Sequence, residues 1–188
     1  MVLPQNAPII VSDYHSMVSP NCGLRYRRQT GIDIYSGKYL PIISIENGIV
    51  LGAVDNKCQG KSILIDHGYD FNNNRLFSMY IHLGKILVSK GDVVERGQEI
   101  ALMFEAGKNE WRECIGALEH LHFHLGSEVD EEYFLFPERS EESMLNERFS
   151  KNPHYLWSDG IGKVTCFDKR KKYREGSITY PVKCKYQN

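Results

Sequence analysis

The chain has 188 residues, of which 41% are hydrophobic and 25% are charged. This length and balance are typical of a folded domain with a sizeable core, and they exclude a chain that is disordered throughout. The 23 Lys and Arg residues nearly cancel the 24 Asp and Glu residues, so no global field attracts the chain to nucleic acid or to an anionic membrane. No window approaches a membrane span, and the first eight residues lack the basic and apolar regions of a signal peptide. We therefore expect no nucleic-acid partner and no membrane insertion.

Short strands and turns follow one another through the first two thirds of the chain. Residues 1–20 are rich in Pro, Asn and Ser and predict an extended lead-in. The predicted strands lie within residues 31–35, 41–54, 62–66, 76–82 and 86–100, with Asn47-Gly48 as a turn or a kink. No helix of useful length is expected before residue 130. This regular spacing predicts an all-β sandwich or barrel over a core of residues 21–127.

The composition changes after Gly126, where we expect an extension over residues 128–188. Residues 128–142 are acidic, and residues 140–149 predict a short helix. Residues 162–167 and 178–184 predict a C-terminal hairpin around a basic turn, 169–174, that we expect to be solvated.

The cysteine pattern leaves two interpretations open. The five cysteines form no CxxC pair, which argues against a zinc ribbon or a thioredoxin-type motif. Cys166 and Cys184 flank the predicted hairpin and would bridge its strands in an oxidising compartment, whereas all five would be free thiols in a reducing one.

A row of histidines marks the segment from Glu119 to Leu125. Polar and apolar residues alternate here with a period of two, which predicts a strand with three imidazoles on one face. Imidazole is the commonest protein metal ligand and a frequent proton carrier near neutral pH, so the row predicts a site rather than a solvated edge strand. The three residues are His120, His122 and His124.

Three separated segments resemble, in order and spacing, the motifs HxGxD, YxHL and HLHF of the lysostaphin/LytM-type zinc endopeptidases. They are Gln29–Asp33, Tyr80–Leu83 and His120–Phe123. The resemblance covers roughly residues 20 to 126, and it implies the LytM-like antiparallel β-sandwich or barrel of the duplicated hybrid motif type. It also implies Zn2+ as cofactor and peptidoglycan peptide as substrate.

The resemblance assigns a role to each matching position. Asp33 and His122 occupy the positions of zinc ligands, and His82 and His120 occupy those of the two catalytic histidines beside the metal-bound water. Catalytic zinc needs three protein ligands and an open position for the water that it acidifies. One imidazole can take a proton from that water while the other, as a donor, stabilises the oxyanion or protonates the leaving amine.

One position departs from the family pattern, because Gln29 stands where the family has its first zinc-binding histidine. A neutral amide oxygen is a poor zinc ligand compared with imidazole. Three accounts remain: a natural pseudo-enzyme that keeps the groove as a binding surface, an engineered inactivation, and a site completed by another histidine. His124, on the face of His122, is the possible substitute ligand, and His15 would approach only if the lead-in folds over the groove.

Two main functions follow from these residues. The first is a zinc metalloendopeptidase that cuts peptidoglycan cross-links or stems in the periplasm or cell envelope. The protein would reach that compartment by a route without a classical signal peptide, or its signal has been removed. The tail lacks a wall-targeting repeat, which favours an antibacterial effector with an immunity or regulatory protein as partner. The alternative is a catalytically dead LytM-like module that binds cell wall or regulates another hydrolase. A phosphocarrier resembling the glucose-specific IIA domain is disfavoured by the His-Leu-His-Phe and Gly-Ile-Asp patterns.

Overall fold

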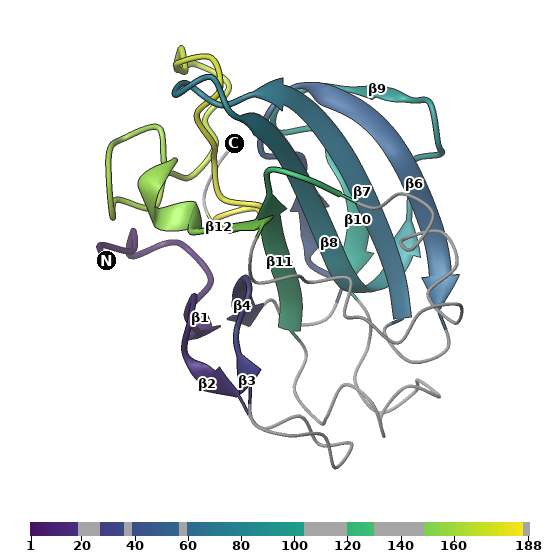
Figure 1. Cartoon of the computed structure of the whole chain (residues 1–188), viewed down its shortest axis with the longest axis horizontal. Helices are drawn as coiled ribbons and strands as arrows, with labels where there is room; N and C mark the ends of the chain where they lie inside the picture. Colours follow the sequence, from purple (N-terminus) through teal and green to yellow (C-terminus); the bar gives the residue numbers. More distant parts are fainter. Residues whose placement is uncertain (19–26, 36–38, 57–59, 104–119, 130–148, 186–188) are drawn as a thin grey trace.

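The computed structural model describes residues 1–18, 27–35, 39–56, 60–103, 120–129 and 149–185, and these residues are nearly all β (Figure 1). They contain no helix long and apolar enough to cross a membrane. The helical element that lies wholly within them is the 3-10 helix η3 (Pro153–Tyr155). The strands are β1 (Ile10–Ser12), β2 (Met17–Val18), β3 (Arg27–Arg28), β4 (Ile32–Tyr35), β5 (Pro41–Ile43), β6 (Gly48–Asn56), β7 (Gly60–Tyr69), β8 (Arg75–Ile86), β9 (Val93–Val94), β10 (Glu99–Met103), β11 (His120–Gly126) and β12 (Ser150–Lys151).

One large antiparallel sheet carries most of these strands in the order β1-β4-β11-β8-β7-β6-β9. β10 joins β8 and β5, β12 joins the end of β11, and β2 pairs with β3 as a separate ribbon. The long strands β6, β7 and β8 curve together, and β11 lies between β8 and β4 (Figure 1). The prediction of an all-β antiparallel fold is therefore confirmed.

The alternation predicted for the histidine strand separates the two faces of the sheet. Leu121, Phe123 and Leu125 are fully buried in the main core cluster. His122 and His124 point to the opposite face, where their cross-strand partners Ile81 and Met79 belong to a second, smaller apolar cluster. Burying each large apolar side chain contributes about 1.5–3 kcal/mol, so a slip of one residue in β11 would exchange core side chains for histidines at a large cost.

Asn47-Gly48 is not the turn of a hairpin, because β5 pairs with β10 and not with the following strand β6. The dipeptide instead marks the point where the chain enters β6 against β7. A Cβ on Gly48 would lie 2.6 Å from the backbone oxygen of Asp66 and 2.8 Å from the ring of His67. Glycine is required here because two segments approach each other closely.

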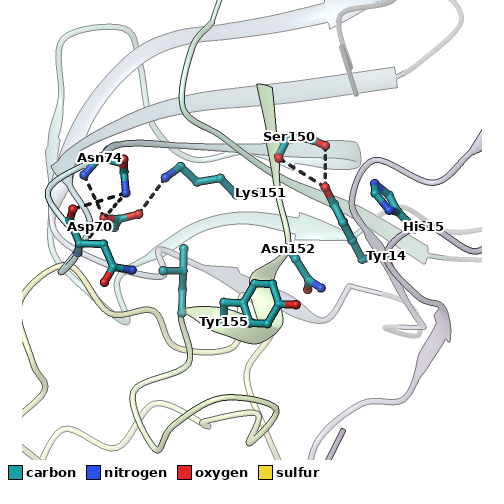
Figure 2. A pocket seen from close by; sticks show the side chains of 10 residues that line it. Tyr14, His15, Asp70, Asn74, Ser150, Lys151, Asn152 and Tyr155 are labelled. Carbon is teal, nitrogen blue, oxygen red and sulfur yellow. Dashed lines mark hydrogen bonds and ion pairs between the residues drawn. The ribbon is translucent and has the colours of Figure 1, made fainter. Parts of the chain in front are cut away.

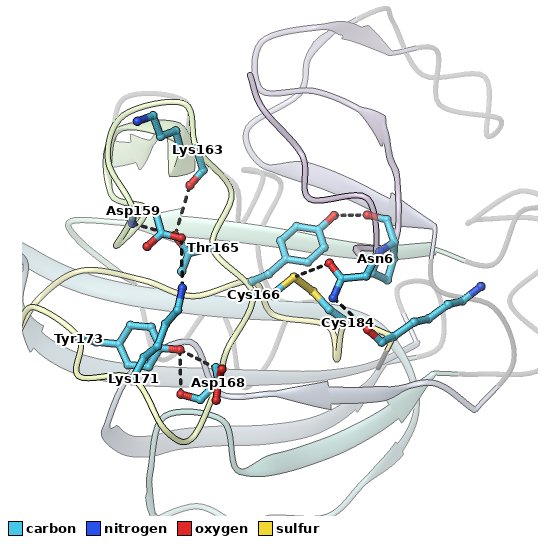
Figure 3. Close-up of a disulfide and its surroundings, with 12 residues drawn as sticks. Asn6, Asp159, Lys163, Thr165, Cys166, Asp168, Lys171, Tyr173 and Cys184 are labelled. Atoms are coloured by element: carbon cyan, nitrogen blue, oxygen red, sulfur yellow. Dashed lines mark hydrogen bonds and ion pairs between the residues drawn. A yellow bond between two sulfur atoms is a disulfide. The ribbon is translucent and has the colours of Figure 1, made fainter. Parts of the chain in front are cut away.

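The predicted C-terminal hairpin is replaced by an irregular arrangement. The segments 162–167 and 178–184 are joined by the Cys166–Cys184 disulfide and by a hydrogen bond from Tyr180 N to Thr165 O, but neither contains a strand (Figure 3). Their other backbone groups pair elsewhere: Val164 N donates to Val2 O and Thr179 N to Ile45 O. The predicted short helix over residues 140–149 lies almost wholly outside the described residues.

The described part of the extension shares the main core with the sheet. Trp157, Ile178, Tyr180 and Val182 are all buried in the same cluster as the side chains of β4, β7 and β11. This packing means that residues 149–185 are held by the same hydrophobic effect as the strands they cover.

A buried ion pair fastens the extension to the sheet. The Arg96 guanidinium pairs with Glu46, donates to Ile45 O at 2.8 Å and to Ser177 O at 2.9 Å, and lies over the ring of Tyr173. Burial lowers the pKa of Arg96 and raises the pKa of Glu46, although each remains the other's partner. Losing either partner would leave the other charge buried without compensation.

His67 has a structural role in this fold, because both of its ring nitrogens form hydrogen bonds within the sheet region. Its Nδ1 donates to Asn47 O at 2.8 Å, so its Nε2 accepts from the Ser78 hydroxyl at 2.7 Å. Burial lowers the pKa of His67 from 6.5 to about 4. The folded state therefore keeps this ring neutral in a pH range where the unfolded chain protonates it.

We expect the free energy of unfolding to fall as the pH drops from about 6.5 towards 4, because the unfolded state binds the extra proton in that window. The contribution of His67 is roughly 1 to 3 kcal/mol. Urea unfolding of the wild type and of His67→Gln, which keeps a donor but does not titrate, measures this contribution. An identical pH dependence in the two proteins would contradict the assignment.

Candidate functional site

The pairing of β4 with β11 places the first two site residues opposite each other. Asp33 lies across from His122 in the ladder, and Tyr35 lies across from His120. This register depends on Gly31, where a Cβ would lie 2.2 Å from the backbone oxygen of Phe123. The glycine of the Gly-Ile-Asp segment therefore lets β4 approach β11 closely enough for Asp33 to meet His122.

Asp33 and His122 are in direct contact, with His122 Nδ1 2.7 Å from Asp33 Oδ1. Burial raises the pKa of Asp33, but the hydrogen bond from His122 and the neighbouring imidazoles outweigh it, so the pKa is lowered overall. The carboxylate therefore stays ionised and accepts the Nδ1 proton. His122 Nε2 is buried and has no hydrogen-bond partner among the described residues.

A β-bulge in β8 turns His82 toward the same group. Lys61 pairs with Leu83 and Ile63 with Tyr80, so Ser62 of β7 faces both Ile81 and His82. His82 adopts a φ of +68°, a left-handed conformation that costs a non-glycine residue about 1–3 kcal/mol. Strict alternation would place His82 on the core face with Tyr80, and the extra residue reverses this.

The outcome of the bulge is a cluster of three imidazoles. The His82 ring lies 4.8 Å from that of His120 and 6.2 Å from that of His122, measured between ring centroids. The structure thus brings together four residues that the family motifs single out, from β4, β8 and β11: Asp33, His82, His120 and His122.

His124 is held apart from this cluster. It is buried, and its ring hydrogen-bonds to the backbone of Thr30, while its Nδ1 has no partner among the described residues. Burial, and then the proximity of His122, lowers its pKa to about 3, so the ring is neutral. The hydrogen bond to Thr30 ties β11 to the segment that leads into β4.

The lead-in does run beside Gln29, but it brings no histidine side chain into the cluster. Gln29 is 6% exposed, its N donates to Ser16 O, and its backbone oxygen accepts from His15 N. The His15 ring stacks on Tyr14 at 4.1 Å and lines a different cavity.

These positions do not complete a catalytic zinc site. Asp33 and His122 offer two strong donors, and the described part of the chain holds no group of three or more His, Cys, Asp or Glu residues able to bind a metal ion. A three-ligand zinc site needs one more strong donor than this, and Gln29 supplies only a neutral amide. The residues present therefore do not fit the zinc that the family resemblance implies.

Sequence patterns do not reveal the bulge or the residue facing it. Ser62 is 1% exposed, and its hydroxyl has no hydrogen-bond partner in the described residues. It is the polar residue at the start of the otherwise apolar run Ser62–Ile65, which is the one signal that could have drawn attention to it.

A carboxylate–imidazole pair thus lies beside two further imidazoles on one face of an antiparallel sheet. The chain belongs to peptidase family M23, whose family model matches residues 27–132. This match covers more than half of the chain and includes the whole cluster.

Relatives in this family act on peptidoglycan. The chain is 31% identical over 108 residues to peptidoglycan DD-endopeptidase ShyA of Vibrio cholerae, and 34% identical over 93 residues to peptidoglycan DD-endopeptidase ShyB of the same organism. These alignments cover 57% and 50% of this chain and 20% and 19% of the relatives, so the chain spans about a fifth of their length.

The catalytic domain of the antimicrobial peptidase lysostaphin from Staphylococcus simulans has a similar fold. Its TM-score is 0.54 at 18% identity, over 78% of this chain and 89% of that domain.

We expect Gly31→Ala to lower the stability by about 1–3 kcal/mol, because the added methyl group collides with the Phe123 backbone and separates β4 from β11. Denaturant unfolding measures the loss, and NMR shifts of the His122 ring report its separation from Asp33. Val93→Ala, at a residue that is 74% exposed, serves as a control and should leave both measurements unchanged. Unchanged His122 shifts in Gly31→Ala would refute the dependence of the site on this contact.

Proposed function

We propose that this chain is a peptidoglycan-directed M23 domain that binds wall peptide, a cross-link or a stem, over β4, β8 and β11. We further propose that Gln29 deprives it of efficient zinc-dependent hydrolysis. One observation carries the proposal: Asp33, His82, His120 and His122 converge. Gln29 stands where the family pattern has a further zinc-binding histidine. The family and its endopeptidase relatives support peptidoglycan as the partner.

The cluster is suited to hold a peptide bond even without a metal. Imidazoles donate or accept hydrogen bonds according to their tautomer, and an amide offers one donor and one acceptor. Asp33 fixes His122 with its proton on Nδ1, and the bulge holds His82 next to His120. Preorganised groups of this kind bind a ligand without the cost of ordering them.

The disulfide supports a site of action in the cell envelope. Cys166 and Cys184 are bonded, and disulfides persist in oxidising compartments such as the bacterial periplasm. Cell-wall peptide is found in the same compartment. The three remaining cysteines lie outside the described residues.

Restoring the histidine should restore the metal. We expect Gln29→His to hold about one zinc per chain by elemental analysis and to digest muropeptides, because it completes a set of three strong ligands. The wild type should hold far less than one zinc while still binding stem peptide in calorimetry. Gln29→Asn, which keeps the amide, should behave like the wild type, and Gln29→His combined with His122→Ala should lose the zinc again. A wild type that carries one zinc and cuts would contradict this proposal.

That contradicting result would favour a second candidate, an active zinc-dependent endopeptidase that obtains its third ligand elsewhere in the chain. The observation in its favour is His82, whose left-handed backbone is held against His120 at an energetic cost that a pure binding surface does not need. In this case elemental analysis of the wild type gives one zinc, and Gln29→Asn retains it.

If the second candidate is correct, we propose that the active enzyme is an antibacterial effector and that a cognate immunity protein inhibits it in the producing cell. The described extension packs into the main core instead of forming a separate wall-binding unit, which suits a small toxin. We expect lysis when the wild-type chain is directed to the periplasm of a susceptible bacterium, and protection when the immunity protein is produced with it. Harmless export of a folded, zinc-loaded chain would rule the effector role out.

A further inference from the structure

A second cavity lies apart from the histidine cluster, where three distant parts of the chain meet (Figure 2). Its volume is about 560 Å³, which is within the usual range for small-ligand sites. The lining residues come from the lead-in, from the turn between β7 and β8, and from the extension: Tyr14 and His15; Asp70, Asn72 and Asn74; and Ser150, Lys151, Asn152, Tyr155 and Leu156. The cavity therefore exists only because the lead-in and the extension fold against the end of the sheet.

A buried ion pair forms the inner wall and leaves it without net charge. Asp70 is 5% exposed, and its Oδ1 accepts from the backbone N–H groups of Asn72 at 2.9 Å and Asn74 at 3.0 Å. Its Oδ2 accepts from Lys151 Nζ at 2.8 Å. Burial raises the pKa of Asp70, but the hydrogen bonds lower it by more, so the pKa falls below its ordinary value. The carboxylate therefore stays ionised and balances the charge of the Lys151 ammonium group.

Hydrogen-bond donors remain around this neutral pair. Lys151 has three N–H groups and uses one on Asp70 among the described residues. The Asn152 Oδ1 accepts from His154 N and caps η3, while its Nδ2 has no hydrogen-bond partner among the described residues; the side chain lines the cavity (Figure 2). Tyr155 is 60% exposed and offers an open aromatic ring beside the buried Leu156.

We propose that this cavity binds an uncharged N-acetylated sugar. Its wall carries no net charge, and its free groups combine N–H donors of Lys151 and Asn152 with the amide oxygens of Asn72 and Asn74, which suits hydroxyl and acetamido groups rather than an ionised group. The Tyr155 ring provides a flat apolar surface for the C–H face of a pyranose, with a polar tip at its edge. A residue of the wall glycan has this chemistry, and that biological assignment rests on the proposed function.

The sugar site is separate from the histidine cluster. Lys151 lies opposite Leu125, whose side chain is in the main core, whereas His122 and His124 occupy the alternate positions of β11. No residue of the cluster of Asp33, His82, His120 and His122 lines the cavity. Sugar binding therefore requires neither zinc nor hydrolysis.

The test is calorimetric and NMR titration of the full chain with chitotetraose, a neutral oligomer of N-acetylglucosamine. We expect saturable binding, with amide shifts at residues 72, 74, 151, 152 and 155. Tyr155→Ala should weaken binding at least tenfold, about 1.4 kcal/mol, whereas Tyr155→Phe keeps the ring and should remain within about threefold. Asn152→Asp keeps the cap on η3 but removes the donor, and it should also weaken binding at least tenfold.

Controls separate loss of binding from loss of fold. Tyr39→Ala, at an exposed tyrosine away from the cavity, should bind as the wild type does, and each variant should unfold at the wild-type temperature. Wild-type affinity in both Tyr155→Ala and Asn152→Asp would overturn the proposal. So would saturation of the same amide shifts by inorganic phosphate or acetate while chitotetraose gives none, since that defines an anion site. Binding of free stem peptide is measured separately, so failure of peptide binding with intact sugar binding rejects the proposed function alone.

Discussion

The close pairing of β4 with β11 is the constraint on which the candidate site depends. Gly31 allows the two backbones to approach, and the resulting register sets Asp33 against His122. On the other face of the same strands, Ile32, Ile34, Leu121 and Phe123 fill the core. Core packing and site geometry are therefore two consequences of one register, and a change that loosens either one disturbs the other.

Buried polar groups around this pairing are unevenly satisfied. The buried polar groups of Arg96, Asp70 and His67 all have hydrogen-bond partners. Arg96 ties the extension to the sheet, Asp70 ties the cavity wall to it, and His67 holds the segment that leads into β6. The unpartnered atoms among the described residues instead gather near the histidine face, at Ser62, His122 and His124. Buried polar atoms without partners are uncommon in native structures, and here they coincide with the candidate site.

Much of the site was predictable because its motifs are short and lie on single strands. The alternation from Glu119 to Leu125 predicts which side chains enter the core, and the structure confirms this division. The resemblance to the lysostaphin/LytM family is confirmed by the family match and by the fold. The roles that the resemblance assigns to individual residues stay predictions. The tail was less predictable, since its backbone pairs with the lead-in and with β5 as well as with itself, through isolated bridges rather than a hairpin ladder.

The sequence by itself determined the strand pattern, the family and the replacement of a histidine by Gln29, because each is a local property of residue type and spacing. Only the tertiary structure decided that a bulge opposite Ser62 turns His82 toward His120, since a bulge depends on the pairing of two strands. It also decided that Cys166 bonds to Cys184 and that the lead-in and the extension line one cavity. The cavity joins residues more than a hundred positions apart, such as Tyr14 and Ser150, and no local pattern encodes such contacts.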